Sequence, residues 1–293
     1  MFVVTGPSGN VGAEVARLTA GRTDLPYRIA AHHPDGIRAR LGPETRVVPF
    51  DYDDRATWPA VLDGVTTLFL LFPLPHPRTV GTRMKPFIDA AVAAGVGHIV
   101  YVSVPGADRQ KVVPHHQVEA HIKASGVPYT ILRCSFFMQN LCRRLSTHGV
   151  DVVERDELFI PAGRGRTTFI DARDVADVVL KIAADPAAYR NREYVLTGAE
   201  RLDFFEVAEI FSAVMGRPIR YTKPSLPRFW WRLWRRGVAW DAVLFMTIVY
   251  TLTRTGKNEP MTDELAALLG RPPRTMREFV RDYLPRWEKR DWT

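Results

Sequence analysis

Three glycines near the N-terminus restrict the fold of this chain more than any other feature. The apolar run Phe2–Thr5 leads directly into Gly6, Gly9 and Gly12, and the amphipathic stretch Val11–Thr19 follows. A buried strand that passes through a glycine turn into a helix is typical of dinucleotide-binding folds. Gly6 suits the tight turn, Gly9 lets the main chain approach a pyrophosphate, and Gly12 lets the helix pack closely against the strand.

The same turn places a helix N-terminus beside the glycines. The first amide groups of a helix, and the positive end of its dipole, attract phosphate groups. We therefore predict that the loop binds a nicotinamide dinucleotide through Gly6, Ser8, Gly9, Asn10, Val11 and Gly12. The alternative is that the glycines only form a turn between a strand and a helix. Their spacing and the pattern that follows them favour the dinucleotide.

The first half of the chain alternates short apolar runs with amphipathic stretches, which is typical of βαβ units and a mostly parallel sheet. We predict strands at Phe2–Thr5, Tyr27–Ala31, Arg46–Phe50, Thr67–Phe72, His98–Val102 and Tyr129–Leu132. Several are apolar throughout, as strands covered on both faces are. A helix is predicted over Met84–Ala94, with Gly95 as its stop signal. The fold class is therefore α/β, with a doubly wound sheet.

After Cys134 the pattern changes. We predict further strands at Phe159–Pro161, Thr168–Ile170 and Tyr194–Leu196, and helices at Asp174–Ala184, Phe204–Met215 and Met276–Leu284. Asp174 is predicted to be an N-cap, since its carboxylate can accept from the amides of the first turn. We expect a dinucleotide-binding domain over residues 1–198, of which 134–166 contribute to a smaller lobe, and a C-terminal substrate lobe over 199–293.

The composition indicates the size of the core, the state of the thiols and the cellular location. Hydrophobic residues make up 46% of the 293 residues, which is enough for a sizeable core. Two cysteines are too few for a disulfide framework or a cysteine metal site, so we expect reduced thiols, no metal and a cytoplasmic location. The chain enters a strand at once, which leaves no room for a signal peptide. Its longest apolar stretch, Ala242–Tyr250, is too short for a membrane span.

The end of the second predicted strand indicates which dinucleotide binds. An acid there would bond the ribose 2′-hydroxyl of NAD(H), and a basic residue would meet the 2′-phosphate of NADP(H). The chain has His32 and His33 there, no acid, and Arg38 and Arg40 shortly after, which favours NADP(H) and leaves NAD(H) open. Histidine is a weak phosphate ligand at neutral pH, so His32 can equally be a solvent-facing residue. Asp51, after the third strand, can reach the adenine or simply form a turn.

Further motifs carry a resemblance to a known family. They are the glycine spacing, His115-x-x-Val118-Glu119, Ser125 to Arg133, Phe136-Phe-Met-Gln-Asn140, Arg164 to Asp171 followed by Asp174-Val-Ala, and Tyr194-Val-Leu-Thr-Gly198. Together they resemble the NmrA-like proteins, which are atypical short-chain dehydrogenase/reductases. The resemblance implies an extended Rossmann fold with a small C-terminal substrate lobe, and binding of NADP(H) or sometimes NAD(H).

The resemblance implies two classes of function. The family includes reductases of quinones, dyes and phenolic ethers, and redox sensors that bind the dinucleotide and regulate a partner without turnover. We predict an NAD(P)H-dependent reductase that passes hydride to a small apolar acceptor, quinone-like or aromatic. The alternative is a non-catalytic sensor with a regulatory protein partner. No Tyr-x-x-x-Lys pair follows the fifth strand, so the usual proton donor of the superfamily is missing and the alternative stays open.

Two residues are candidates for the chemistry. His115 stands where some NmrA-like reductases have a lysine, four residues before Glu119, and a histidine can donate a proton near neutral pH. It can also cap or solvate the start of a helix. Ser103, at the end of the fifth strand, can orient a carbonyl or be an ordinary turn serine. We interpret Arg133 and Asp171 as structural.

The resemblance also indicates which segments line the ligands. The loop after the fourth strand is expected to lie along the dinucleotide; its residues are Leu71, Phe72 and Pro73. The segment expected to wall the nicotinamide pocket contains Phe136, Phe137 and Asn140. Aromatic side chains at such positions are as readily part of the core.

One segment carries most of the unbalanced charge. The formal net charge is +8, and residues 217–236 contain seven basic residues and no acid. Residues 227–236 also contain four aromatic residues. We favour a cap over the active site for 227–236, and a homodimer contact or an anionic membrane surface as alternatives. Elsewhere basic residues alternate with acids, so nucleic acid is the least favoured partner.

Overall fold

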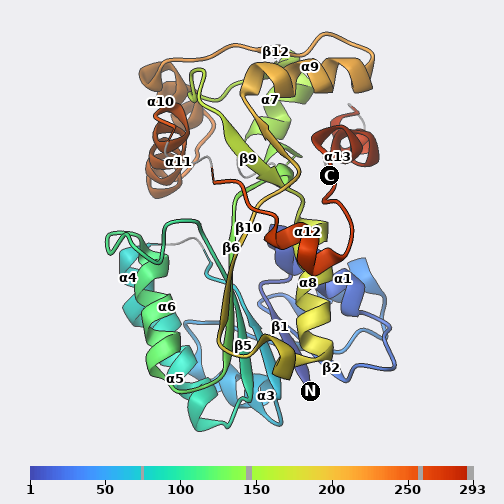
Figure 1. The fold of residues 1–293 in the computed structure, drawn as a ribbon, viewed down its shortest axis with the longest axis vertical. Helices are drawn as coiled ribbons and strands as arrows, with labels where there is room; N and C mark the ends of the chain where they lie inside the picture. The colour runs from blue at the N-terminus through green and yellow to red at the C-terminus, as the bar shows by residue number, and fades with distance from the viewer. Residues whose placement is uncertain (74–75, 143–146, 257–259, 289–293) are drawn as a thin grey trace. The chain divides into compact units, whose positions relative to one another are not determined.

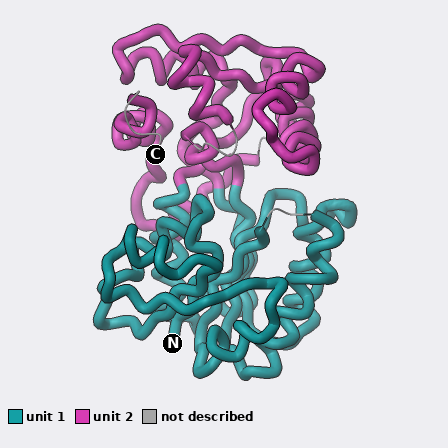
Figure 2. Tube along the Cα trace, turned by 180° about the vertical axis from the view of Figure 1, so that it is seen from behind, with its two compact units in different colours: residues 1–134, 172–196 teal, residues 135–171, 197–293 magenta. Residues whose placement is uncertain are grey.

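The computed structural model describes residues 1–73, 76–142, 147–256 and 260–288. It divides into two compact units, coloured separately in Figure 2. The first unit comprises Met1–Cys134 and Ala172–Leu196, and the second comprises Ser135–Asp171 and Thr197–Thr293. Each unit is therefore assembled from segments that are distant in the sequence.

The first unit is built on a seven-stranded sheet in the order β10-β6-β5-β4-β1-β2-β3. All neighbouring strands are parallel. The strands are β1 (Phe2–Thr5), β2 (Tyr27–Ala31), β3 (Val47–Pro49), β4 (Thr67–Leu70), β5 (His98–Ser103), β6 (Tyr129–Cys134) and β10 (Arg192–Leu196). The chain builds outward from β1 to β3 and then returns to add β4 on the other side of β1, so the sheet is doubly wound. The predicted α/β class is confirmed.

Helices cover both faces of this sheet. They are α1 (Asn10–Thr19), α2 (Pro34–Leu41), α3 (Trp58–Leu62), α4 (Pro77–Thr79), α5 (Lys85–Ala93), α6 (Pro114–Ala124) and α8 (Ala172–Ala184). The helices α1 and α8 pack together on one face, and α5 packs with α3 and α6 on the other (Figure 1). The strand residues Val3, Leu68 and Ile99 are completely buried, as expected for a parallel sheet with two covered faces.

Some predicted boundaries in this unit are wrong by one or two residues. The strand predicted to reach Phe72 ends at Leu70, because the amide of Leu71 donates to the Thr5 hydroxyl instead of a strand carbonyl. The strand predicted over Arg46–Phe50 covers only Val47–Pro49.

The starts of two helices also differ from the predictions. The helix predicted from Met84 is an α-helix only from Lys85, since a π-helical turn occupies Val80–Met84. Asp174 is not an N-cap, because α8 already begins at Ala172. Its carboxylate lies in the first turn instead, where it still faces the positive end of the helix dipole.

The second unit combines two small sheets with six α-helices among its described residues. The strand orders are β11-β9-β7 and β12-β8, with β7 (Phe136–Phe137), β8 (Glu157–Leu158), β9 (Thr167–Ile170), β11 (Glu200–Leu202) and β12 (Arg220–Tyr221). The helices are α7 (His148–Arg155), α9 (Phe204–Met215), α10 (Leu226–Arg235), α11 (Trp240–Arg254), α12 (Glu264–Leu269) and α13 (Met276–Asp282). Large buried aromatic side chains fill the core; they include Phe169, Phe204, Phe211, Phe279 and Trp287.

The strand predicted over Phe159–Pro161 is wrong. The strand β8 lies two residues earlier and pairs with only two residues of β12, so the ladder ends at Leu158. Phe159 and Ile160 are buried in the core of the second unit, which explains their apolar character without a sheet.

Helix α9 shows how local sequence sets an element. Asp203 accepts from the amides of Phe205 and Glu206, and the Glu206 carboxylate accepts from the Asp203 amide. This capping box fixes the start, and Gly216, with φ of 65°, ends the helix. The predicted span Phe204–Met215 is confirmed. Within the described parts of the chain, every helix is too short or too polar to cross a bilayer.

Candidate functional site

The glycine loop closes on itself between β1 and α1. The Gly9 amide donates to the Gly6 carbonyl at 3.0 Å. Gly6 has φ of 62°, a left-handed conformation that side chains disfavour. Gly9 is the N-cap of α1 and has no side chain with which to cap the first turn. The loop therefore presents bare main chain at a helix N-terminus, an arrangement that attracts phosphate groups.

The packing of the loop requires glycine at position 12 more strictly than at position 9. A Cβ on Gly12 would lie 2.1 Å from the Gly6 carbonyl oxygen and 2.8 Å from Leu71 Cδ1. A backbone atom cannot move aside as a side chain can, so Gly12 is fixed by internal packing. A Cβ on Gly9 would lie 3.3 Å from the same oxygen, which is tight but tolerable. The packing of the loop thus leaves space at Gly9.

The sheet order places this loop at the position where such sheets bind ligands. β1 lies between β4 and β2, and the chain order reverses there. In doubly wound sheets, ligands bind beyond the carboxyl ends of the strands at the reversal. Leu71, just after β4, contacts the loop, since a Cβ on Gly6 would lie 2.9 Å from its Cδ1. The Leu71 carbonyl accepts from the Tyr52 hydroxyl at 2.9 Å.

The carboxyl ends of β2 and β3 bring two predicted residues together. His32 Nε2 lies 3.1 Å from Asp51 Oδ2. The Asp51 carboxylate also accepts from the amide of Asp53 at 2.9 Å, so it forms the turn that was the alternative interpretation. His32 is exposed and its ring meets that of His33 edge to face.

The two arginines of α2 differ in what they contact. Arg38 donates to Asp35 and to the Val47 carbonyl, both at 2.8 Å. Arg40 donates to the Pro7 carbonyl at 2.6 Å, within the glycine loop. Both arginines were candidates for the 2′-phosphate, and Arg40 is the one whose guanidinium lies at the loop. Residues two apart on a helix do not share a face, so the two arginines meet different surroundings.

His115 is buried at the start of α6. Its Nδ1 lies 2.7 Å from the hydroxyl of Tyr101 on β5, and its ring packs edge-on against Phe72, 5.2 Å between centroids. Pro73 follows Phe72 and is half-buried. Burial lowers the pKa of the His115 imidazole to about 3, because the charged ring would lose its hydration. The expectation that this pKa lies near working pH is wrong, and the ring is neutral at pH 7.

Ser103 is part of a buried ionic network. Its hydroxyl donates to Glu119 Oε1 at 2.5 Å. Arg133 binds the same carboxylate with two hydrogen bonds of 3.0 and 2.6 Å and also pairs with Glu193, whose other oxygen lies 2.6 Å from Lys123 Nζ. The network joins β5, α6, β6 and β10. Because the Ser103 proton is held by Glu119, only the oxygen lone pairs remain to meet a ligand.

The predicted pocket residues of the second unit are only partly accessible. Phe136 is buried, and its ring contacts those of Phe169, Phe204 and Tyr250 at centroid distances of 5.4 to 6.3 Å. It is therefore a core residue of this unit. The neighbouring residues Phe137 and Asn140 are half-buried.

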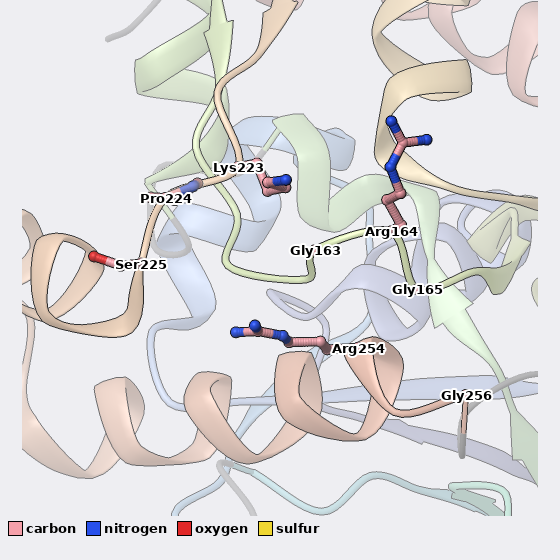
Figure 3. A pocket seen from close by; sticks show the side chains of 8 residues that line it. All are labelled: Gly163, Arg164, Gly165, Lys223, Pro224, Ser225, Arg254 and Gly256. Carbon is pink, nitrogen blue, oxygen red and sulfur yellow. The ribbon is translucent and has the colours of Figure 1, made fainter.

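A basic cleft that the sequence analysis missed lies within the second unit. It has a volume of about 560 Å³ and is lined by Gly163, Arg164, Gly165, Lys223, Pro224, Ser225, Arg254 and Gly256 (Figure 3). The loop 163–165 crosses the end of α11 so closely that a Cβ on Gly165 would lie 2.0 Å from the Thr253 carbonyl oxygen. Three separate segments form this cleft, which is why no local pattern revealed it.

Comparison with known sequences decides the family. The sequence profile of the NmrA-like family matches residues 1–233, a range that contains the glycine loop, the His115 helix and most of the second unit. The chain belongs to the NmrA-like family. A relative, the NAD(P)H azoreductase of Xenophilus azovorans, is 30% identical over 285 residues, which cover 96% of this chain and 97% of the relative.

Solved structures of NmrA-like and related proteins share the fold. The NADPH-dependent quinone oxidoreductase of Escherichia coli is 24% identical, with a TM-score of 0.78 over 97% of this chain and 100% of that chain. NmrA, a negative transcriptional regulator solved in complex with NADP, is 19% identical, with a TM-score of 0.75 over 100% of this chain and 98% of that chain. At these identities the likeness concerns the fold, and it includes both an enzyme and a regulator.

Proposed function

We propose that this chain is an NAD(P)H-dependent reductase that passes hydride to a small apolar acceptor, quinone-like or aromatic. The observation that carries the proposal is the space at Gly9, at a helix N-terminus and at the reversal of strand order. The relative named an NAD(P)H azoreductase supports the same reaction class, since it matches nearly the full length of both chains.

The residues of the loop fit the diphosphate of a dinucleotide. The main chain from Gly6 to Gly12 would hold the phosphates, because a Cβ is absent where they approach. Arg40 and His32 would lie on the side of the adenosine ribose, and the lack of an acid at the end of β2 favours NADP(H) over NAD(H). When bound, the reduced nicotinamide supplies the hydride.

His115 would act as a neutral hydrogen-bond donor. If Nδ1 accepts from the Tyr101 hydroxyl, Nε2 carries the proton, and no described residue bonds that nitrogen. A neutral Nε2–H can orient the oxygen or nitrogen of an acceptor, while water supplies the proton that completes the reduction. Ser103 would contribute an oxygen that accepts a hydrogen bond. Both residues stand at the carboxyl end of the sheet or beside it.

The second unit would recognise the acceptor. Phe137 and Asn140 are half-buried, so their side chains retain surface for a ligand, whereas Phe136 would support them from the core. We assign acceptor binding to a lobe formed by residues 199–293 together with 134–166, with Leu71, Phe72 and Pro73 of the first unit along the dinucleotide.

The test separates binding from folding. Gly9→Ala adds a Cβ that the loop tolerates, so the variant should fold while its affinity for NADPH falls at least about tenfold, because the methyl occupies the phosphate approach. NADPH and NADH titrations by tryptophan quenching measure affinity, and loss of NADPH absorbance with quinones and azo dyes measures turnover. Gly36→Ala is the matched control, since no atom lies within 4 Å of its added Cβ. Undiminished affinity in Gly9→Ala would refute the proposed site.

The second candidate is a dinucleotide-binding regulator. It is favoured by the absence of a Tyr-x-x-x-Lys pair after β5 and by the low pKa of His115, which removes an imidazolium acid. Tight NADPH binding without turnover of any quinone or azo acceptor would select this alternative. Turnover that depends on His115 would exclude it.

A further inference from the structure

Two adjacent helices of the second unit carry an unusually apolar surface. Nine large hydrophobic side chains are strongly exposed among the described residues, and seven of them lie on α10 and α11. We call this set the α10–α11 face; it consists of Trp230, Trp231, Trp234, Trp240, Leu244, Phe245 and Ile248. Trp231, Trp234 and Trp240 are 57%, 73% and 65% exposed. Exposed apolar groups that gather in one place mark an interaction site, whereas scattered ones do not.

The face is continuous across both helices, which run side by side in Figure 1. The indole N–H of Trp230 donates to the Thr247 hydroxyl of α11 at 2.9 Å. The Trp230 and Trp240 rings also meet edge to face, 6.2 Å between centroids. On α11 the exposed positions Trp240, Leu244 and Ile248 recur every four residues, so they form a single stripe.

The opposite side of α10 already provides the contacts that hold the helix in place. Phe229 and Leu233 are completely buried. Arg232 and Arg236 reach inward to the buried carboxylate of Asp151 at 2.9 and 2.8 Å. Trp231 and Trp234, on the outer side, are therefore not needed to pack the helix, and another interaction must account for them.

Positive charge accompanies the face. Residues 217–254 contain eight basic residues and one acid, Asp241. Arg228 and Arg235 are exposed on α10 and have no carboxylate within 4 Å in the described ranges, and the Arg235 guanidinium lies over the Trp231 ring. The basic cleft adds Lys223 and Arg254 where α10 begins and α11 ends.

We propose that the α10–α11 face binds the surface of an anionic phospholipid bilayer, with the tryptophans at the headgroup level and the arginines on the phosphates. Indole rings with an apolar body and a polar N–H favour the membrane interface, and interfacial helices combine such rings with arginines. A second copy of the chain is a poorer partner, because a symmetric contact would bring several arginines together with only Asp241 of this segment to balance them. The proposal does not depend on the reductase activity.

Vesicle flotation with the full chain tests the proposal. We expect binding to vesicles of equal parts phosphatidylcholine and phosphatidylglycerol, weakened by salt, and little binding to phosphatidylcholine alone. Trp231→Ser/Trp234→Ser should lower the partition coefficient at least about tenfold. Arg228→Glu/Arg235→Glu should lower it at least about thirtyfold, since each basic residue near an anionic surface contributes to binding. Tryptophan emission should shift to the blue on binding to the anionic vesicles.

Matched controls stand elsewhere on the surface. Val112→Ser removes an exposed apolar side chain and Arg109→Glu reverses an exposed charge, and both should bind vesicles as the native chain does. Failure of the native chain to bind anionic vesicles at low salt would overturn the proposal. So would equal binding by the tryptophan variant, or a dimer in solution that this variant dissociates.

Discussion

The glycine loop is packed so tightly that a position lacks a side chain, whereas the α10–α11 face carries large side chains that pack against little of the protein. At Gly12 even one carbon is too many, because the backbone of Gly6 occupies the space. On the α10–α11 face, by contrast, Trp231, Trp234 and Trp240 are each more than half exposed to solvent. Gly9 is in this respect similar to the α10–α11 face and unlike Gly12. The packing of the loop would tolerate a Cβ at Gly9, so packing does not explain why glycine stands there. A position that internal packing does not explain is where a ligand is to be sought.

The largest effect is expected at the position that packing fixes. Gly12→Val places its Cβ 2.1 Å from the Gly6 carbonyl oxygen, far inside van der Waals contact, so the free energy of unfolding should fall by more than about 4 kcal/mol. Urea unfolding followed by circular dichroism measures it. Gly36→Ala in α2, with an open site, should be neutral or slightly stabilising. A Gly12→Val variant with native stability would show that the loop is not packed as described.

The buried ionic network of the first unit should give the next largest effect. Glu119→Ala removes the carboxylate that accepts from Ser103 and Arg133. Among the residues that the structure describes, the buried Arg133 then keeps only Glu193 as an acidic partner. The free energy of unfolding should fall by about 3 kcal/mol. By contrast, Arg235→Glu, which reverses an exposed charge, should change the free energy of unfolding by less than about 0.5 kcal/mol. Ser103→Ala should destabilise the fold less than Glu119→Ala does. If Ser103 contacts the acceptor, the folded Ser103→Ala variant should still have a lower kcat than the native chain.

Sequence reasoning succeeded where one local rule determines the structure. The glycine spacing and the apolar strands each act within a few residues, and the structure bears out the sheet and the predicted span of α9. Sequence reasoning failed where contacts between distant segments determine the structure. The Phe159–Pro161 strand depended on how much of β12 was available to pair, and the pKa of His115 on burial beside Phe72 and Tyr101.

The candidate site shows the same division. Gly6, Gly9 and Gly12 come from one short segment, so their arrangement could be predicted. Which arginine of α2 reaches the loop depends on how α2 is placed against it, and Arg40 rather than Arg38 does so. The basic cleft needed three segments to be brought together by folding.

Acid should weaken the cores of both units, in contrast to the exposed face. The folded pKa of His115, about 3, lies below the ordinary value of 6.5. The unfolded chain therefore binds the proton first, so the stability that neutral His115 provides is complete above about pH 6.5 and is lost as the pH falls toward 3. Between pH 7 and pH 5 the native chain should lose about 2 kcal/mol more than His115→Gln. Urea unfolding at both pH values measures the difference.

The second unit offers an independent version of the same test. Burial, together with the charge of Arg236, lowers the pKa of His148 to about 3, and its ring bonds the Tyr250 hydroxyl. His148→Gln should reduce the acid sensitivity in the same direction as His115→Gln. Identical pH profiles for the native chain and both variants would mean that these rings are not buried as neutral groups.

The smallest effect on the free energy of unfolding should come from substitution of the exposed tryptophans of α10. Trp231 and Trp234 are largely exposed, so Trp231→Ser/Trp234→Ser should change the free energy of unfolding by less than about 0.5 kcal/mol per site. Phe229→Ser, two residues before Trp231 on the buried side of α10, should lower the free energy of unfolding by about 3 kcal/mol or more. The two variants alter the same helix, so the comparison isolates exposure from helix propensity. If the outer tryptophans proved as important for stability as Phe229, they would belong to the core, and the need for an external partner would vanish.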